Sequence, residues 1–307
     1  MKKKKTAGIG ILEGLIRLHG LLPLKYHRFL ARILAWIFRG VLHYRVDVVY
    51  TNLARSFPEK SYGEIKRIEK RFYLHFATVF SEMIWFGSCR GDRGRRRLEK
   101  SHIVEFTNPE EFNRLIKANP QMMVMQNHAG NWELIAGVKQ YSYGEPLDLE
   151  PSEVSVAYVP LASAFWDAFT ANNRLAPIMD TVFNGYIDFN HILRHVLSNR
   201  TAKMVYVFIT DQYPYKHGAG DMKINFMHQD TYSMSAAAGL AVKMGMSAVY
   251  LRYRTRPEGG YTMTVVPIAE NASESTVSDI MTQYYKLLEE DLREQPWNYL
   301  WTHKRWK

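Results

Sequence analysis

The sequence predicts an α/β fold in which helices flank a mostly parallel central sheet. Short apolar runs, typical of buried strands, alternate with longer segments whose apolar residues recur at helical spacing. Polar residues follow two of these runs directly, at the position where open α/β sheets bind their ligands. Hydrophobic residues make up 47% of the 307 residues and charged residues 23%, so we expect a large core and little disorder.

The individual elements follow from period and from turn residues. Alternating or continuous apolar runs predict strands over residues 122–125, 153–159, 203–209, 222–227, 246–255 and, at the edge of the sheet, 261–267. Helical spacing predicts helices over residues 62–86, 132–138, 161–173, 185–200, 233–244 and 275–294. Pro296 ends the last of these helices.

The first 44 residues are predicted to form a helical, membrane-associating segment ahead of one domain over residues 45–307. A basic tip, MKKKKT, precedes two apolar stretches, 7–24 and 29–42, which charged residues such as Glu13 and Arg32 interrupt. Neither stretch reaches the roughly 18 uncharged residues of a typical transmembrane helix, and no small-residue cleavage site marks a signal peptide. We expect helices lying in the membrane interface; a helical hairpin packed on the domain and a single tilted span are the alternatives.

The charge balance indicates an anionic partner. The net charge is +10, from 40 Lys and Arg against 30 Asp and Glu, which suits nucleic acid, anionic lipid or an acidic protein. Nucleic acid is disfavoured because the basic residues are scattered and no binding motif is present. The densest run, residues 90–100, is predicted to be a loop because of its glycines. It is either a solvated loop or a docking patch for an anionic carrier or phospholipid headgroups, formed by Arg93, Arg95, Arg96 and Arg97.

The chain shows few signs of metal or cofactor chemistry. Cys89 is the single cysteine, so no intrachain disulfide and no cysteine-based zinc site can form. Gly8 and Gly10 do not make a dinucleotide fingerprint, because no strand precedes them, and no phosphate-binding loop is present. No Gly-x-Ser-x-Gly elbow supplies a nucleophile. We therefore expect no metal and no cofactor.

The residues NHAGNWE, 127–133, form the most informative motif. They begin where the strand 122–125 ends, so His128 is expected in a turn, with Asn131 as the N-cap of the following helix and Glu133 in its first turn. A neutral imidazole can take a proton from an attacking hydroxyl while a carboxylate holds its tautomer. A purely structural His–Glu pair is the alternative.

The motif resembles the signature of the bacterial lipid A late acyltransferases, the lauroyl/myristoyl transferase family, which transfers a fatty acyl chain from a carrier thioester to a lipid hydroxyl. The resemblance extends from about Arg45 to Lys307 and includes the tail QPWNYLWTHKRWK. An N-terminal pattern belongs to it as well: Arg45, Asn52, Leu53, Phe57 and Pro58. The segment after Asp211 departs from the family's Phe-Gly-Thr pattern, which leaves the lipid acceptor open.

The resemblance implies a role for each part of the motif. His128 would be the general base and Glu133 the group that orients it. Backbone amides around Gly130 and Asn131 would help to stabilise the oxyanion.

Two further positions match the family's active-site pattern. Arg174 matches its arginine and would bind phosphate or assist the oxyanion; a buried salt bridge, to Asp211 for example, is the alternative. Asp211 and Gln212 match its Asp-Gln pair at a later strand end.

The resemblance implies an enzyme on the cytoplasmic face of a bacterial inner membrane. It would move an acyl group from acyl carrier protein or coenzyme A to a hydroxyl of a lipid A precursor, directly and without an acyl-enzyme. Partners would be the carrier, the anionic membrane and the lipid acceptor. Two alternatives remain: an acyltransferase for another glycolipid, aminolipid or lysophospholipid, and a non-enzymatic basic membrane-binding protein.

Overall fold

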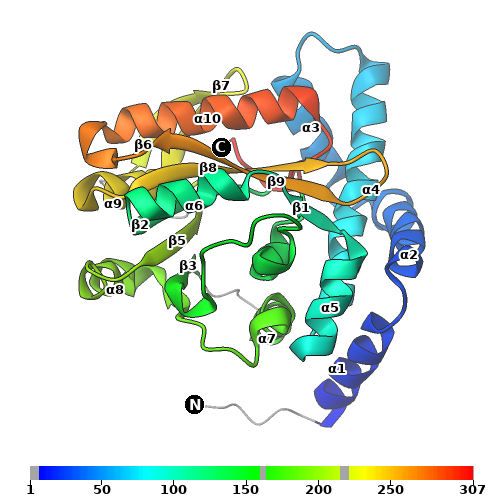
Figure 1. The fold of residues 1–307 in the computed structure, drawn as a ribbon. Coiled ribbons are helices and arrows are strands. Elements are labelled where there is room, and N and C mark those ends of the chain that lie inside the picture. The colour runs from blue at the N-terminus through cyan, green and yellow to red at the C-terminus, as the bar shows by residue number, and fades with distance from the viewer. Residues whose placement is uncertain (1–6, 160–163, 215–220, 307) are drawn as a thin grey trace.

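The fold is built on one mixed sheet. The computed structural model describes residues 7–159, 164–214 and 221–306. Within them the sheet has seven strands in the order β1-β9-β8-β2-β5-β3-β4 (Figure 1). Strands β8, β2, β5, β3 and β4 are parallel, β9 is antiparallel to β8, and β1 is parallel to β9. This confirms the predicted α/β fold with a mostly parallel sheet.

The strand bounds agree with the predicted apolar runs at most positions. The central sheet contains β1 (Val104–Phe106), β2 (Gln121–Gln126), β3 (Val154–Tyr158), β4 (Gly185–Asp188), β5 (Met204–Ile209), β8 (Ser247–Thr255) and β9 (Tyr261–Ala269). A separate antiparallel hairpin contains β6 (Asp221–Phe226) and β7 (Gln229–Met234).

Three predictions about these elements are wrong. Residues 185–188 form strand β4, so the helix predicted over 185–200 begins only after it. The helix predicted from residue 233 begins at Ala236, because residue 233 belongs to the hairpin. Strand β9 is not the edge of the sheet, since β1 pairs with its outer side. Local periodicity does not show which strands become neighbours, and that decides all three cases.

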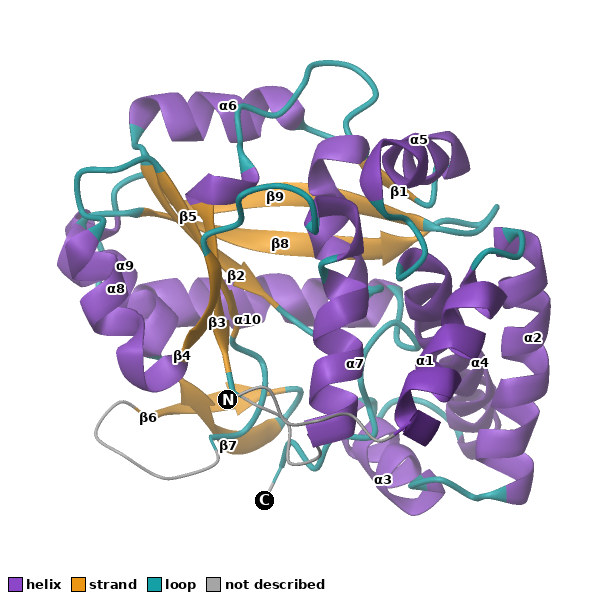
Figure 2. Cartoon of the chain, turned by 90° about the horizontal axis from the view of Figure 1, so that it is seen from below, coloured by secondary structure: helices purple, strands orange, loops and turns teal. Residues whose placement is uncertain are grey.

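Helices cover both faces of the sheet. They are α1 (Ala7–Gly20), α2 (Leu24–Trp36), α3 (Val46–Ser56), α4 (Tyr62–Phe86), α5 (Gly91–Ser101), α6 (Pro109–Ala118), α7 (Ala164–Arg174), α8 (Ile192–Ser198), α9 (Ala236–Met244) and α10 (Val277–Glu294). The start of the helix predicted over 161–173 lies outside the described residues. Figure 2 shows α10 and α6 on opposite sides of β8 and β9, and α1, α2 and α4 together beside the sheet.

Side chains that alternate along the central strands pack into two separate cores, one on each face of the sheet, as the two-residue period of a strand requires. On β2, Met123 and Met125 pack with α9 and α10, whereas Met122 and Val124 pack with α5 and α6. Both faces of the central strands are therefore buried, which is why they are continuous apolar runs.

Helix α4 has the predicted bounds and carries the N-terminal helices. A capping box between Ser61 and Glu64 begins it. Arg28 of α2 pairs with Glu82 of α4 at 3.1 Å, and Arg39, in the π-helical turn Ile37–Val41 that follows α2, pairs with Glu69 of α4 at 2.9 Å. Across the described ranges, no helix combines the length and apolar character needed to cross a membrane. Membrane association of this segment and the boundary at residue 44 stay predictions, and the basic tip lies outside the described residues.

The predicted arginine-rich loop is instead helix α5. Its glycines serve close packing, because a Cβ on Gly94 would lie 2.2 Å from the carbonyl carbon of Cys89. Gly91 provides the positive φ of +60° with which the helix begins. The same glycines that predicted a loop therefore allow a tight turn between α4 and α5.

The C-terminal tail returns to the N-terminal part of the domain. The Asn52 side chain donates to the carbonyls of Trp301 and His303, both at 2.9 Å, and Arg45 donates to Thr302 O at 2.8 Å. Arg305 is fully buried and donates to the Tyr285 hydroxyl at 2.9 Å. The two terminal sequence patterns thus form one contact.

Candidate active site

Two neighbouring parallel strands bring the main polar residues together. Strand β2 ends at Gln126 and β5 at Ile209, and the two are in register along their whole length. The Thr210 amide then donates to Gln126 O at 3.0 Å, so the chain segments that follow both strands stay side by side. This places His128 next to Asp211, although 83 residues separate them in the sequence.

Asp211 is the hydrogen-bond partner of His128. Its Oδ1 and Oδ2 lie 2.8 Å and 3.1 Å from His128 Nδ1, and Oδ2 also accepts the His128 backbone N–H at 3.3 Å. The His128 side chain is 14% exposed and that of Asp211 is 1% exposed. Donation from Nδ1 to the carboxylate leaves Nε2 as the basic nitrogen. His128 Nε2 accepts a hydrogen bond from the side-chain amide nitrogen of Gln212 at 3.2 Å.

Asp211 is held in its charged form despite its burial. Burial alone raises the pKa of Asp211, but the neighbouring His128 and hydrogen bonds from His128 and Tyr299 lower it below its ordinary value. The ionised carboxylate is therefore available to stabilise a positive charge on the imidazole.

Glu133 is not the group that orients His128, contrary to the prediction. Its two oxygens lie 2.5 Å and 2.7 Å from Nε and Nη2 of Arg174 in a bidentate pair, and Trp132 Nε1 donates to it at 2.9 Å. A bidentate guanidinium is a strong carboxylate partner, and here it takes both oxygens. Arg174 thus pairs with Glu133 and not with Asp211.

The pair remains ionic in a largely buried setting. Burial lowers the pKa of Arg174, but the charge and hydrogen bonds of Glu133 outweigh this and raise it above its ordinary value. The Trp132 ring meets His128 edge-on, with 5.0 Å between ring centroids. Trp132 therefore connects the Glu133–Arg174 pair with the His128–Asp211 pair.

The amides of the turn are already used within the protein. Ala129 N–H donates to Asn127 Oδ1 at 2.7 Å, and Gly130 N–H donates to Asn298 Oδ1 at 2.9 Å. Gly130 cannot supply the predicted oxyanion contact while this second bond holds. Its glycine is required instead for a φ of +66° and for space, since a Cβ would lie 2.5 Å from that of Tyr253.

Asn131 is not a side-chain N-cap, because residues 132–140 form a 3-10 helix and its side chain makes no capping bond. Its side-chain amide donates instead to Glu82 on α4 at 3.0 Å. Asn131 is fully buried, so it fixes the turn to α4.

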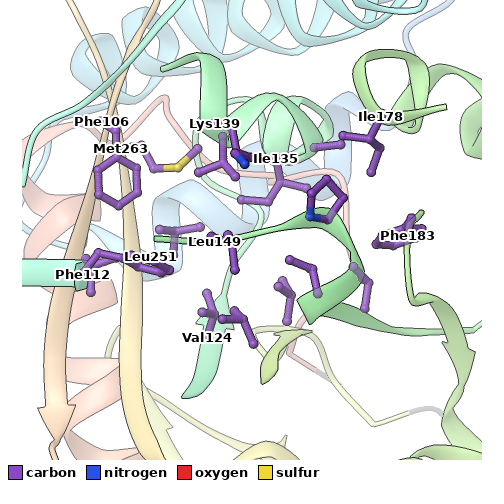
Figure 3. Close-up of a pocket in the computed structure, with 18 of the residues that line it drawn as sticks. Phe106, Phe112, Val124, Ile135, Lys139, Leu149, Ile178, Phe183, Leu251 and Met263 are labelled. Carbon is purple, nitrogen blue, oxygen red and sulfur yellow. The ribbon is translucent and has the colours of Figure 1, made fainter. Parts of the chain in front are cut away.

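An apolar cavity adjoins the Glu133–Arg174 pair, and sequence reasoning did not find it. It has a volume of about 80 Å³, is partly open to solvent, and lies between the sheet and the 3-10 helix that carries Glu133. Figure 3 shows its labelled side chains converging on one space, from Val124 on β2 to Ile178 and Phe183 beyond α7. Tyr186, another lining residue, interacts electrostatically with Arg174. Val124 of β2 and Val205 and Val207 of β5 lie on the same face of the sheet and line the cavity, and these valines were the sequence signal for it.

The arginines of α5 divide into two groups. Arg95 binds Asp180 at 2.7 Å and also Asp92, while Arg97 donates to the carbonyls of Gly20, Leu21 and Leu22 at the end of α1. These two arginines are therefore committed within the protein. Arg93 and Arg96 are exposed, so of the four residues of the predicted docking patch only these two face solvent.

Other reactive groups are buried or scattered. Burial raises the pKa of the Cys89 thiol to about 12, which makes it a poor nucleophile. In the part of the chain that the structure describes, no cluster of three His, Cys, Asp or Glu side chains is placed to hold a metal ion.

The comparisons with known proteins identify one family. No curated protein matched the sequence. A family described as bacterial lipid A biosynthesis acyltransferase matches residues 2–307, nearly the whole chain. The chain therefore belongs to the bacterial lipid A biosynthesis acyltransferase family and is an acyltransferase.

Proposed function

We propose that the protein transfers a fatty acyl chain from an acyl carrier protein or coenzyme A thioester directly to a hydroxyl of a lipid A precursor. The proposed location is the cytoplasmic face of a bacterial inner membrane. The observation that carries the chemistry is the His128–Asp211 pair, in which Nδ1 donates to Asp211 and leaves Nε2 as an acceptor, with the Gln212 side-chain N–H as its donor. Family membership supports the acyl donor and the lipid acceptor in general.

The His128–Asp211 pair suits a general base. The acceptor hydroxyl replaces the Gln212 amide at Nε2 and gives its proton to His128 as its oxygen attacks the thioester carbonyl. The tetrahedral intermediate collapses with cleavage of the C–S bond, and the imidazolium returns the proton to the leaving thiolate. Asp211, buried and ionised, stabilises the imidazolium in between.

The oxyanion has a different donor from the one expected. Once displaced from Nε2, the Gln212 amide is free to donate to the developing oxyanion, in place of the occupied amides of Ala129 and Gly130. Arg174 supplies a fixed positive charge nearby, because Glu133 holds two of its nitrogens in place. No cofactor is needed for these steps.

The apolar cavity supports a fatty acyl donor. Its lining is almost entirely aliphatic and aromatic, and Lys139, the one charged lining residue, is paired with Glu150 at 2.7 Å. Such a lining favours a hydrocarbon chain over a polar ligand. An acyl chain there would place its thioester near the Arg174 end.

The test is acyl transfer by purified protein from acyl carrier protein and coenzyme A thioesters. Lipid acceptors would be a lipid A precursor and, as the alternative, another glycolipid, an aminolipid and a lysophospholipid. His128→Ala removes the base, so its rate of acyl transfer should be about 10²–10⁴-fold lower than that of the wild type. Asp211→Asn should also be strongly impaired, and the double variant should be no slower than His128→Ala, because both residues serve one proton transfer.

An exposed histidine provides the control, since His191→Ala lies outside the site and should retain activity. Near-normal turnover by folded His128→Ala would exclude His128 as the general base. An acyl adduct on the intact protein, seen by mass spectrometry, would exclude direct transfer.

A further inference from the structure

A basic groove lies between α2, α4 and the turn that joins β8 to β9. It is open to solvent and has a volume of about 270 Å³. Arg28 and Arg32 come from α2, Arg71 from α4, and Arg256 from the β8–β9 turn. Figure 1 shows this end of β8 and β9 beside α4, on the side of the molecule that carries α2. The groove is separate from the apolar cavity, with which it shares no lining residue.

Two of the four arginines form no ion pair with any carboxylate that the structure describes. Arg28 is paired with Glu82 at 3.1 Å, and Arg256 with Glu105 at 3.1 Å. Among the described residues, no carboxylate forms an ion pair with Arg32 or Arg71. The groove therefore has a positive charge that an anionic ligand would neutralise.

The guanidinium of Arg71 is held in place by a ring. Its central carbon lies 3.1 Å from the centroid of the Trp297 ring, so the group stacks on the indole. Stacking fixes the guanidinium plane and leaves its N–H edge for a ligand. His75 also lines the groove, and its buried Nε2 has no hydrogen-bond partner within the described chain.

The helix beside the groove indicates what kind of anion fits. On α2, Phe29, Ile33 and Trp36 are 58%, 43% and 66% exposed, and they alternate along the helix with Arg28 and Arg32. A ligand with a phosphate in the groove and apolar chains along α2 would satisfy both features. An arginine fork matches phosphate oxygens in geometry. A free phosphate ion would leave the exposed apolar residues without a partner.

We propose that this groove binds the phosphate headgroup of an anionic membrane phospholipid. Arg32 and Arg71 contact the phosphate, and Phe29 and Ile33 contact the acyl chains. The inference rests on the proposed membrane association and is independent of the acyl-transfer chemistry.

The choice of variants follows from the contacts. Glu82, which accepts from Arg28, also accepts from Asn131 of the catalytic turn at 3.0 Å. Replacing Arg28 would therefore disturb the turn, whereas among the described residues no ion pair joins Arg32 or Arg71 to Glu82. The test variant is Arg32→Gln/Arg71→Gln.

The matched control removes one exposed cation from each of the same two helices outside the groove. It is Lys25→Gln/Lys70→Gln, since neither lysine lines the groove. A second test variant, Phe29→Ser/Ile33→Ser, removes the apolar contact alone. Circular dichroism and thermal unfolding would verify that all three variants are folded.

The measurement is calorimetric titration of the full chain with monomeric short-chain phosphatidylglycerol and, separately, with inorganic phosphate. A charge-assisted contact typically accounts for about tenfold in affinity. We expect Arg32→Gln/Arg71→Gln to bind the lipid about 100-fold more weakly, and the lysine control to match the wild type. Phe29→Ser/Ile33→Ser should weaken lipid binding but not phosphate binding.

Three results would overturn the inference. They are absence of lipid binding by the wild type, equal weakening in the arginine and lysine variants, and binding of inorganic phosphate as tight as that of the lipid. No acyl donor takes part, so none of these outcomes depends on whether the protein transfers acyl groups as proposed. If the protein did not transfer acyl groups, the lipid affinities expected from the titration would likewise be unchanged.

Discussion

Each of the two carboxylates near His128 has its own hydrogen-bonded partner. Asp211 meets the imidazole through Nδ1, while Glu133 is bound at two points by Arg174. Both carboxylates are nearly inaccessible, with Glu133 8% and Asp211 1% exposed. An unpaired charge in such a place is costly, so each pair has a structural role besides any chemical one.

Breaking the Glu133–Arg174 pair should reduce stability strongly. Glu133→Gln and Arg174→Gln should each lower the free energy of unfolding by about 3–5 kcal/mol, because each leaves one buried charge unpaired. The double variant should lose clearly less than the sum of the two. Urea unfolding of the wild type, both singles and the double measures this as a cycle.

Arg293 on α10 provides the control for this cycle. It is 55% exposed and pairs with Glu289 one turn away, so Arg293→Gln should lower the free energy of unfolding by no more than about 0.5 kcal/mol. Single variants of Glu133 and Arg174 that are as stable as Arg293→Gln would contradict the structural role of the pair.

At the scale of elements, charged residues of similar appearance have different environments. The arginines of α5 lie on one helix, yet Arg97 reaches the last carbonyls of α1 while Arg96 faces solvent. Helix α2 shows the reverse arrangement, with large apolar residues exposed beside cations. This pattern is typical of a helix that lies in a membrane interface.

The apolar residues of α2 should drive binding to lipid bilayers. Phe29→Ser/Ile33→Ser/Trp36→Ser should reduce co-sedimentation with vesicles sharply. Burial of each apolar side chain in the bilayer contributes roughly 1.5–3 kcal/mol to the free energy of binding. Stability should change little, since all three are exposed. The comparison is vesicle binding by the variant and by the wild type across a range of lipid concentrations.

Helix α8 offers a control with similar exposure. Leu193 and Leu197 are 43% and 45% exposed there, and Leu193→Ser/Leu197→Ser should bind vesicles as the wild type does. If the α8 variant lost binding and the α2 variant did not, the membrane-facing side would have been assigned to the wrong helix.

At the scale of the whole molecule, the C-terminal tail contacts the turn of the candidate active site. Asn298 Oδ1 accepts the Gly130 N–H at 2.9 Å, and its side-chain amide donates to Tyr253 O at 2.9 Å. Tyr299 pairs with Ala129 in a β-bridge and contributes a hydrogen bond to Asp211. The shape of the catalytic turn thus depends on residues at the far end of the chain.

Asn298→Ala should therefore impair both stability and activity. It leaves the Gly130 N–H and the Tyr253 carbonyl unpaired in a buried place, at a cost of about 1–3 kcal/mol each. We expect a lower unfolding midpoint together with a strongly reduced rate of acyl transfer under conditions where the variant is folded.

Gln295→Ala is the matched control for Asn298→Ala. Gln295 accepts from and donates to Thr255 on the neighbouring strand, but it has no contact with the turn. It should lose stability and keep its rate. Equal rate losses in the two variants would show that the tail acts through general stability alone.

Much of the fold could be predicted from the sequence because its signals are local. The bounds of α4 follow from apolar residues at helical spacing and from the Ser61 capping box, and β2 and β5 are continuous apolar runs. The prediction was wrong for α5 and β4. There, contacts with other parts of the fold decide the structure of glycines and of short segments. For Gly94, that neighbour is the backbone of Cys89.

The sequence by itself determined that His128 follows a buried strand and that Asp211 follows another. Only the tertiary structure decided that these two strands are neighbours, so that Asp211 and not Glu133 reaches the imidazole. The reason is physical: a hydrogen bond depends on distance and direction in space, and sequence separation constrains neither beyond a few residues. Glu133, five residues from His128, pairs with Arg174, whereas Asp211, 83 residues away, lies within 2.8 Å.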